Sequence, residues 1–254
     1  MPIIFHGVTL VEGTGGLGRY ARAALTALRR GPLAGEVRVM MPSALRGHRG
    51  LSDLGEIHFY PAIHPKRGFA FNHLFWVNCL ALHVRRKFPN APVFSPIEIH
   101  SMIPFRHLLI TAHDCYADRF GDPRQPGRAG LGRRLCVRQL KRSRVMAVSH
   151  FTTRELASLH GILPPQVETV SNWLDQDYDR NPPATRLAAV RDRLALPERF
   201  WLYVGGFRLN KNLSLLFDAY ASACASGPTP PLVIAGRIPK EDTPFTGQIG
   251  RAHV

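Results

Sequence analysis

Short apolar runs alternate with amphipathic helical patterns along most of the chain, and this alternation constrains the fold more than any other feature. Over residues 17–28, apolar residues recur three and four positions apart, which predicts a helix that Gly31-Pro32 ends. Seven apolar runs predict buried strands, at residues 3–5, 37–41, 57–60, 91–95, 107–112, 144–149 and 166–171. At the start of the helix after residue 149, Thr152 and Glu155 have the spacing of a capping box.

Strands that alternate with helices predict a parallel sheet with helices on both faces. We therefore expect an α/β fold, in which ligands bind in the loops after the carboxyl ends of the strands.

A second domain is predicted after residue 173, where the pattern is interrupted. Residues 174–186 are polar, contain prolines and show no periodicity, so we place a linker at 174–198. A strand at 200–206, a helical stripe at 213–224 and a strand at 231–236 follow. Two strands cannot close a core by themselves. We therefore expect an N-terminal Rossmann-like domain at 1–173, the linker, and an incomplete second Rossmann-like domain at 199–248.

The charge of the chain favours partners that carry negative charge. The chain has 254 residues, and its 33 Lys and Arg outnumber its 18 Asp and Glu, for a net charge of +15. Nucleic acid, anionic lipid and phosphorylated substrates are attracted by such a charge. Arginine dominates the cations, so a genome rich in G and C is an alternative cause.

The sequence shows no run of about 18 apolar residues and no signal-peptide pattern at its start. We therefore expect neither a spanning helix nor secretion. Four scattered cysteines without a C-x-x-C pair fit free thiols in a reducing compartment.

Glycines crowd residues 13–18, directly before the first predicted helix. Gly15 and Gly16 would leave backbone amides exposed at a helix N-terminus, which favours an anion. Glycine also lets a phosphate or a sugar approach the backbone closely. The stretch has neither the spacing of a dinucleotide fingerprint nor the lysine of a P-loop. A tight turn without a ligand is the alternative interpretation.

A histidine and an aspartate follow another predicted strand. His113 could meet a substrate hydroxyl or phosphate, and the neighbouring Asp114 would tune it. A histidine at the rim of the core is the alternative. His100, His107 and His113 do not share one helix face, so we expect no metal site.

Positive charge gathers at two further places. Arg208 and Lys211 follow Gly205 before the second-domain helix, where they could neutralise a diphosphate or remain solvated. The helix predicted at 133–144 could lie on anionic lipid or present a solvated face. The cations that would contact lipid are Arg133, Arg134, Arg138, Lys141 and Arg142.

The order of these pieces resembles glycosyltransferase family 4, the group 1 glycosyltransferases of the GT-B fold. The matching motifs are GGLGRY at 15–20, TAHD at 111–114, AVSHFTTREL at 147–156, VSNWLD at 170–175 and YVGGFRLNKN at 203–212. The first motif is most similar to the mannosyltransferase-like branch that builds bacterial surface polysaccharides. The resemblance implies two Rossmann-like domains, of which the second is incomplete here.

The same resemblance implies a retaining, metal-independent hexosyltransferase without a cofactor. It would transfer a hexose, such as mannose, from a GDP- or UDP-linked sugar to a lipid-linked or polysaccharide acceptor. The expected catalytic residues are His113 and Asp114. The expected donor- and phosphate-binding residues are Gly15, Gly16, Gly205, Arg208 and Lys211. The residues expected to have an acceptor-binding or structural role are Arg19, Tyr20, Ser149 and Asn172. We expect a cytoplasmic protein that contacts the inner face of the plasma membrane and binds no nucleic acid.

Two departures from the family pattern lead to further expectations. Relatives have arginine where this chain has Gly206, so Arg208 would replace it. Relatives also continue into a pair of glutamates that holds the donor, and this chain has no such motif. Residues 249–254 back-translate to a common sequencing adapter. We therefore expect these last residues to be adapter sequence, and the chain as written to lack measurable transfer.

A non-catalytic basic α/β module that binds phosphorylated glycan or nucleic acid is the alternative function. A nucleic-acid binder would show affinity that falls steeply with salt. A sugar phosphorylase is disfavoured, because the sequence shows no recognisable surroundings of a cofactor-binding lysine.

Overall fold

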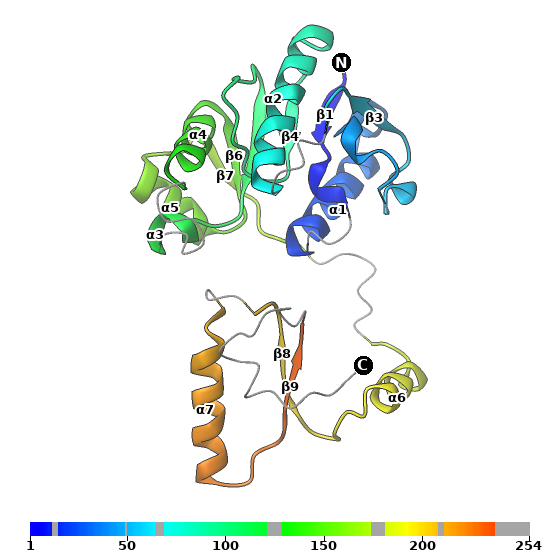
Figure 1. Ribbon diagram of the computed structural model, residues 1–254, viewed down its shortest axis with the longest axis vertical. Helices are drawn as coiled ribbons and strands as arrows, with labels where there is room; N and C mark the ends of the chain where they lie inside the picture. The colour runs from blue at the N-terminus through cyan, green and yellow to red at the C-terminus, as the bar shows by residue number, and fades with distance from the viewer. Residues whose placement is uncertain are drawn as a thin grey trace. The chain divides into compact units, whose positions relative to one another are not determined.

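The computed structural model describes residues 1–11, 15–48, 50–63, 69–120, 129–173, 181–207 and 211–236. The chain divides into two compact units, Met1–Asp175 and Gln176–Val254 (Figure 1). The domain and linker boundaries expected from the sequence stay predictions.

The first unit is built on a parallel sheet of seven strands in the order β3-β2-β1-β4-β5-β6-β7. The strands are β1 (Ile3–His6), β2 (Val37–Pro42), β3 (Ile57–Tyr60), β4 (Val93–Ser95), β5 (Leu108–Ala112), β6 (Arg144–Ala147) and β7 (Val167–Thr169). This arrangement confirms the predicted α/β fold class. The strand order reverses between β1 and β4, and open α/β sheets bind ligands beside such a switch point.

Helices cover both faces of this sheet (Figure 1). They are α1 (Gly15–Arg30), α2 (Phe69–Lys87), α3 (Tyr116–Phe120), α4 (Ala129–Arg142) and α5 (His150–His160). Short 3-10 helices lie at Val8–Leu10, Ala34–Glu36, Ser43–Leu45 and Ser52–Leu54.

Two hydrophobic cores flank the sheet, because successive residues of a strand face opposite sides. On one face, α2 and α4 bury Trp76 and Leu140 in the same cluster as Ile4. On the other face, α1 buries Leu25 in the cluster that contains Phe5. Each fully buried side chain of this size contributes about 1.5–3 kcal/mol to folding. The apolar stripe predicted for the first helix therefore holds α1 on the sheet.

The start of α5 differs from the prediction of a capping box. The N-cap is Ser149, whose Oγ accepts a hydrogen bond from the Thr152 amide at 3.1 Å. Glu155 binds Arg119 instead, with Nε and Nη2 donating to its two carboxylate oxygens at 2.7 and 2.6 Å. A bidentate, charge-assisted pair is stronger than one bond to a backbone amide. The tertiary contact therefore overrides the local motif.

The second unit contains α6 (Ala184–Arg193), β8 (Trp201–Val204), α7 (Leu213–Ser226) and β9 (Leu232–Ala235). β8 and β9 pair in parallel, and these two strands and α7 lie where the sequence predicts them. The stretch expected to be an irregular linker contains α6, because its Ala, Leu and Arg residues favour a helix once Pro183 has set its start. Leu213 is the one hydrophobic side chain that is buried among those described in this unit.

Candidate functional site

The switch point of the first sheet is lined by buried polar side chains. His6 ends β1 and Ser95 ends β4. The Ser95 hydroxyl donates to the Ile97 carbonyl at 2.7 Å, so its oxygen accepts the proton of His6 Nδ1 across 3.1 Å. His6 Nε2 then carries a lone pair, to which no hydrogen bond is donated from the described part of the chain. Burial lowers the pKa of His6 to about 4, so the ring is neutral at pH 7.

Two more histidines extend this cluster away from β1. The ring of His73, from α2, lies 5.6 Å from that of His6 and 6.3 Å from that of His100, measured between centroids. Burial is the main cause of a lowered pKa in both His73 and His100. Within the described ranges, no group of three or more His, Cys, Asp or Glu is arranged to hold a metal ion. His6 is not among the predicted site residues, although it stands at the end of a buried strand and His113 directly follows one.

Tyr20 and His113, both predicted as site residues, meet beside β5. His113 Nε2 donates to the Pro96 carbonyl at 2.8 Å, and its ring meets the Tyr20 ring edge-on, with centroids 4.7 Å apart. The Tyr20 hydroxyl shares a hydrogen bond of 3.1 Å with Thr111 Oγ1. The ring of Trp173 lies 5.7 Å from that of Tyr20. Because Nε2 carries the proton, His113 Nδ1 is the atom that can accept a hydrogen bond from a ligand hydroxyl.

The N-terminus of α1 lies next to this group. Gly15 adopts a positive φ of 60°, and a Cβ placed on Gly15 or Gly16 would meet no atom within 4 Å. Gly16 precedes Tyr20 by four residues, so both lie on the same face of the helix. The first turn of α1 contains no acidic residue, which leaves the positive end of the helix dipole for an anion. Arg19 is exposed on the adjoining turn.

Two of the predicted residues, Asp114 and Ser149, have structural roles in this unit. Asp114 Oδ1 accepts the Tyr116 amide at 3.0 Å at the start of α3, and Ser149 caps α5. Both contacts satisfy helix N-termini without a ligand. Burial raises the pKa of Cys115 to about 12, so this thiol is not a nucleophile at neutral pH. Asn172 is exposed beside Trp173.

Two predicted residues of the second unit flank its elements: Gly205 directly follows β8, and Lys211 precedes the start of α7. A Cβ on Gly205 would lie 2.6 Å from the Tyr203 hydroxyl, and one on Gly236 would lie 1.9 Å from the Gly205 carbonyl. Packing against backbone therefore requires glycine at position 236, whereas at position 205 a shift of the Tyr203 side chain would make room. Lys211 is exposed just before α7, and Arg208 lies outside the described residues. The predicted residues that the structure groups together in the first unit are Gly15, Gly16, Tyr20 and His113.

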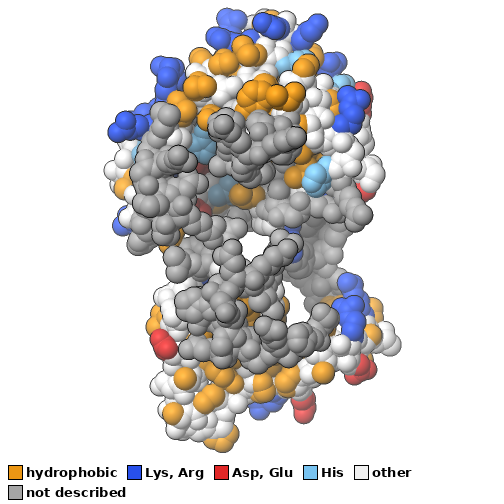
Figure 2. Space-filling model, viewed as in Figure 1, with side chains coloured by type: hydrophobic (Ala, Val, Ile, Leu, Met, Phe, Trp, Pro, Cys, Tyr) orange, Lys and Arg blue, Asp and Glu red, His pale blue; other side chains and the backbone are white. Residues whose placement is uncertain are grey.

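Positive charge is concentrated away from this site. Lys and Arg side chains gather where α2 ends, at the amino edge of the sheet (Figure 2). The helices of a parallel α/β unit end at this edge, since each returns the chain to the start of the next strand. Cations in the last turn of α1, α2 and α4 therefore complement the negative ends of the helix dipoles. This accounts for part of the net charge without a ligand.

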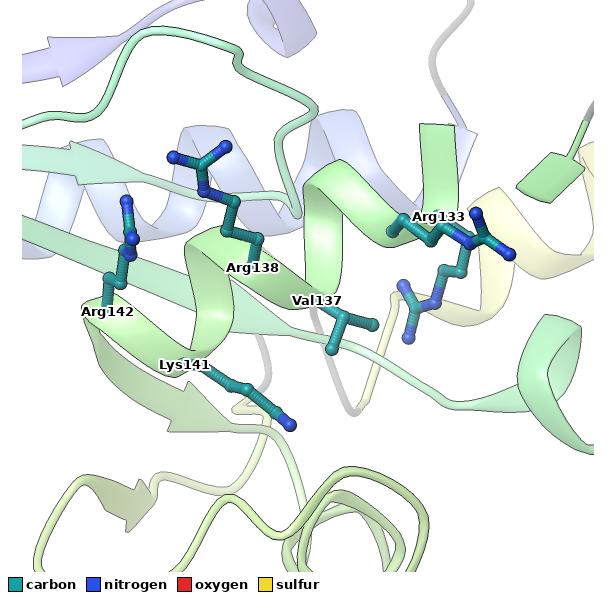
Figure 3. Close-up of a pocket in the computed structure, with 6 residues that line it drawn as sticks. Arg133, Val137, Arg138, Lys141 and Arg142 are labelled. Atoms are coloured by element: carbon teal, nitrogen blue, oxygen red, sulfur yellow. The ribbon is translucent and has the colours of Figure 1, made fainter. Parts of the chain in front are cut away.

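A cationic groove of about 540 Å³ runs along α4 (Figure 3). The residues that line it are Arg133, Arg134, Val137, Arg138, Lys141 and Arg142. Four of these cations, all except Arg133, lie on one side of the helix at intervals of four, three and one residues. Within the part of the chain that the structure covers, none of the four has a hydrogen bond or an ion pair.

Arg133 was predicted to contact lipid, but its side chain faces internal carboxylates instead. Its guanidinium donates to both carboxylate oxygens of Asp118 and to Glu98, and its side chain is only 22% exposed. Burial raises the pKa of Asp118, but hydrogen bonds from Arg133 and His160 outweigh it and lower the pKa overall. Arg133 therefore belongs to an internal ion-pair network. No described helix is both long and apolar enough to cross a membrane.

No protein-family model matches the chain, and no curated protein matches it. Among solved structures, the chain is similar to a glycosyltransferase from Rickettsia africae ESF-5, with a TM-score of 0.50 and 12% identity. The similarity covers 92% of this chain and 68% of that chain. At this identity, the likeness shows that the chain has the fold of that protein and carries no function with it.

Proposed function

We propose that the chain is part of a retaining family 4 glycosyltransferase that transfers a hexose from a nucleotide-sugar to a glycan or lipid-linked acceptor. The observation that carries this proposal is the position of Gly15, Gly16, Tyr20 and His113. These residues lie together at the carboxyl edge of a sheet whose fold is shared with a glycosyltransferase. In open α/β sheets this edge is where ligands bind. Mannose, and a GDP- or UDP-linked donor, belong to the proposal because the GGLGRY motif resembles the mannosyltransferase branch.

Each grouped residue has a chemical role in this proposal. The amides of Gly15 and Gly16 would bind a phosphate or a sugar hydroxyl at the positive end of α1. His113 would accept a hydrogen bond from a sugar hydroxyl through Nδ1, since Pro96 already takes the proton of Nε2. Lys211, with Arg208, would neutralise the leaving diphosphate, which is electrostatic stabilisation of developing charge. The proposed reaction needs no metal, because cations of the chain supply that charge.

Donor binding tests this proposal by calorimetry on the 254-residue chain. We expect GDP- or UDP-linked hexoses to bind saturably, and Lys211→Ala to weaken binding about tenfold or more through the loss of a charge-assisted hydrogen bond. Lys87→Ala, at the exposed end of α2, is the matched control and should leave binding unchanged. Failure of every nucleotide-sugar to bind, together with salt-steep affinity for RNA or DNA, would establish the alternative basic module.

We also propose that Arg134, Arg138, Lys141 and Arg142 hold the protein on the anionic inner face of the plasma membrane, near a lipid-linked acceptor. Each cation at such a surface contributes about 1 kcal/mol. Vesicles that contain phosphatidylserine should sediment the wild-type protein, and phosphatidylcholine vesicles should not. Replacing all four cations by glutamine should abolish sedimentation, whereas Arg85→Gln and Arg86→Gln together should not. Equal sedimentation of both variants would contradict a specific role for α4.

A further inference from the structure

Trp173 is an exposed aromatic residue that the proposed catalytic roles leave unused. It follows β7 at the carboxyl edge of the first sheet, and 41% of it is exposed. Trp76, in the same unit, is buried in the core. A large aromatic side chain that stays exposed beside a polar site offers a contact surface, because its burial by a ligand would remove much apolar area from water.

The neighbours of Trp173 hold it in place on one side. The ring planes of Trp173 and Tyr20 meet at 53°. Tyr20 itself is immobilised, since it is 9% exposed, is hydrogen-bonded to Thr111 and stands at 86° to the ring of His113. A fixed neighbour therefore supports the indole while the remaining part of its surface stays open. His113 Nδ1, which can accept a hydrogen bond, belongs to the same aromatic group.

This combination suits one class of ligand. A pyranose ring presents C–H groups on its face and hydroxyl groups around its rim. The negative π face of an aromatic ring attracts the C–H groups, and a nearby acceptor receives a proton from one hydroxyl. A nucleobase would stack equally well, but its edge needs a matched donor and acceptor pair. Among the described side chains that contact Tyr20, Thr111 can also accept a hydrogen bond but is fully buried, so His113 Nδ1 is the acceptor that remains for a ligand.

We infer that Trp173, supported by the buried ring of Tyr20, forms a stacking platform for a pyranose ring, with His113 Nδ1 accepting a hydrogen bond from one of its hydroxyl groups. This inference rests on the proposed function and names a residue that would determine its sugar specificity. The site needs no nucleotide, so it is expected to hold a simple glycoside by itself.

Saturation-transfer NMR with methyl α-mannopyranoside and methyl α-glucopyranoside on the 254-residue chain tests the inference. We expect saturation of the ring protons of at least one glycoside. Trp173→Ala should weaken its binding about tenfold, and Trp173→Phe should largely restore it because a smaller aromatic face remains. Trp201→Ala removes an exposed tryptophan from the other unit and should change nothing. Thermal unfolding that matches the wild type would show that each variant is folded.

Two results would overturn the inference. The first is equal glycoside affinity, or equal absence of binding, in wild type and Trp173→Ala. The second is saturation of the base protons of UDP or GDP that Trp173→Ala abolishes while glycoside binding is unaffected, which would make the platform a nucleobase site. Donor binding that persists in either case leaves the proposed function standing. Glycoside binding that depends on Trp173, without any donor binding, would support the platform and refute the transferase.

Discussion

At the scale of single residues, the partners of each buried ionisable group decide its charge. His6 is surrounded by neutral groups and has one serine partner, so burial keeps it neutral. Arg133 is also removed from most solvent, but two carboxylates, those of Asp118 and Glu98, keep it charged. The same type of burial therefore has opposite consequences at the two positions.

The stability of the first unit is expected to fall as the pH is lowered from about 6.5 toward 4. Below pH 6.5 the unfolded chain binds a proton at His6, whereas the folded chain binds it only near pH 4, so acid favours unfolding. At pH 5 this difference amounts to about 2 kcal/mol. Urea unfolding at pH 7.5 and pH 5 measures it. His6→Asn should lose part of the pH dependence, and the exposed control His107→Asn should keep it. An unchanged pH dependence in His6→Asn would contradict the role of His6.

Removal of the Arg133 guanidinium is expected to destabilise the first unit strongly. Arg133→Met leaves two partly buried carboxylates without their cation, which costs about 3–5 kcal/mol of unfolding free energy. Urea denaturation measures the loss, and the exposed neighbour Arg134→Met should stay within about 0.5 kcal/mol of the wild type. Adding Glu98→Gln and Asp118→Asn to Arg133→Met should recover much of the stability. Equal losses of unfolding free energy in Arg133→Met and Arg134→Met would show that the ion-pair network does not stabilise the fold.

At the scale of elements, the edge that carries the candidate site is made of helix starts. Asp114 accepts the Tyr116 amide at the start of α3, Ser149 caps α5, and α1 starts at Gly15 and Gly16. Side-chain caps satisfy the free amides of a helix start. Where glycines stand at the start of α1, the backbone is open to a ligand. The free amides of a helix start therefore contribute to stability in α5, and in α1 we propose that they bind a ligand.

Loss of the α5 cap is expected to lower stability without affecting the site. Ser149→Ala removes the acceptor of the Thr152 amide and should lower the free energy of unfolding by about 1 kcal/mol, whereas Ser149→Asp should preserve it. Chemical denaturation checks this, with Ser158→Ala near the other end of α5 as the control. If Ser149→Ala and Ser149→Asp are equally destabilised, the capping role is wrong.

At the scale of the whole molecule, the two units differ in how much apolar surface they bury. The first unit has a core on each face of its sheet. In the second unit Leu213 is the buried hydrophobic side chain of the described part, and Trp201, Leu202 and Val204 of β8 are 59%, 56% and 72% exposed. Burial of apolar area is the dominant favourable term in folding. The second unit should therefore be the less stable of the two.

Denaturation is expected to proceed in two steps. Trp76, which is buried and donates to the Ile63 carbonyl at 2.9 Å, reports the first unit, and Trp201 reports the second. Trp173 also lies in the first unit, so a Trp76→Phe/Trp173→Phe double variant keeps only the second-unit reporter. Its fluorescence should change at lower urea concentration than that of a Trp201→Phe variant. Far-UV circular dichroism of the wild type should show both transitions. Coincident transitions by all probes would mean that the units unfold as one.

The sequence by itself determined the elements: the parallel α/β class, β1 to β9, α1 and α7 follow from apolar periodicity, which depends only on neighbours in the chain. It also pointed to Gly15, Gly16 and His113, because glycines before a helix and a histidine after a strand are local signals, whereas Tyr20 was expected only from the resemblance of its motif. Only the tertiary structure decided which side chains meet. The contacts of His6 with Ser95, Glu155 with Arg119, and Trp173 with Tyr20 join segments far apart in the chain. Strand order sets these pairs, and strand order results from packing of the whole sheet, which no local pattern encodes.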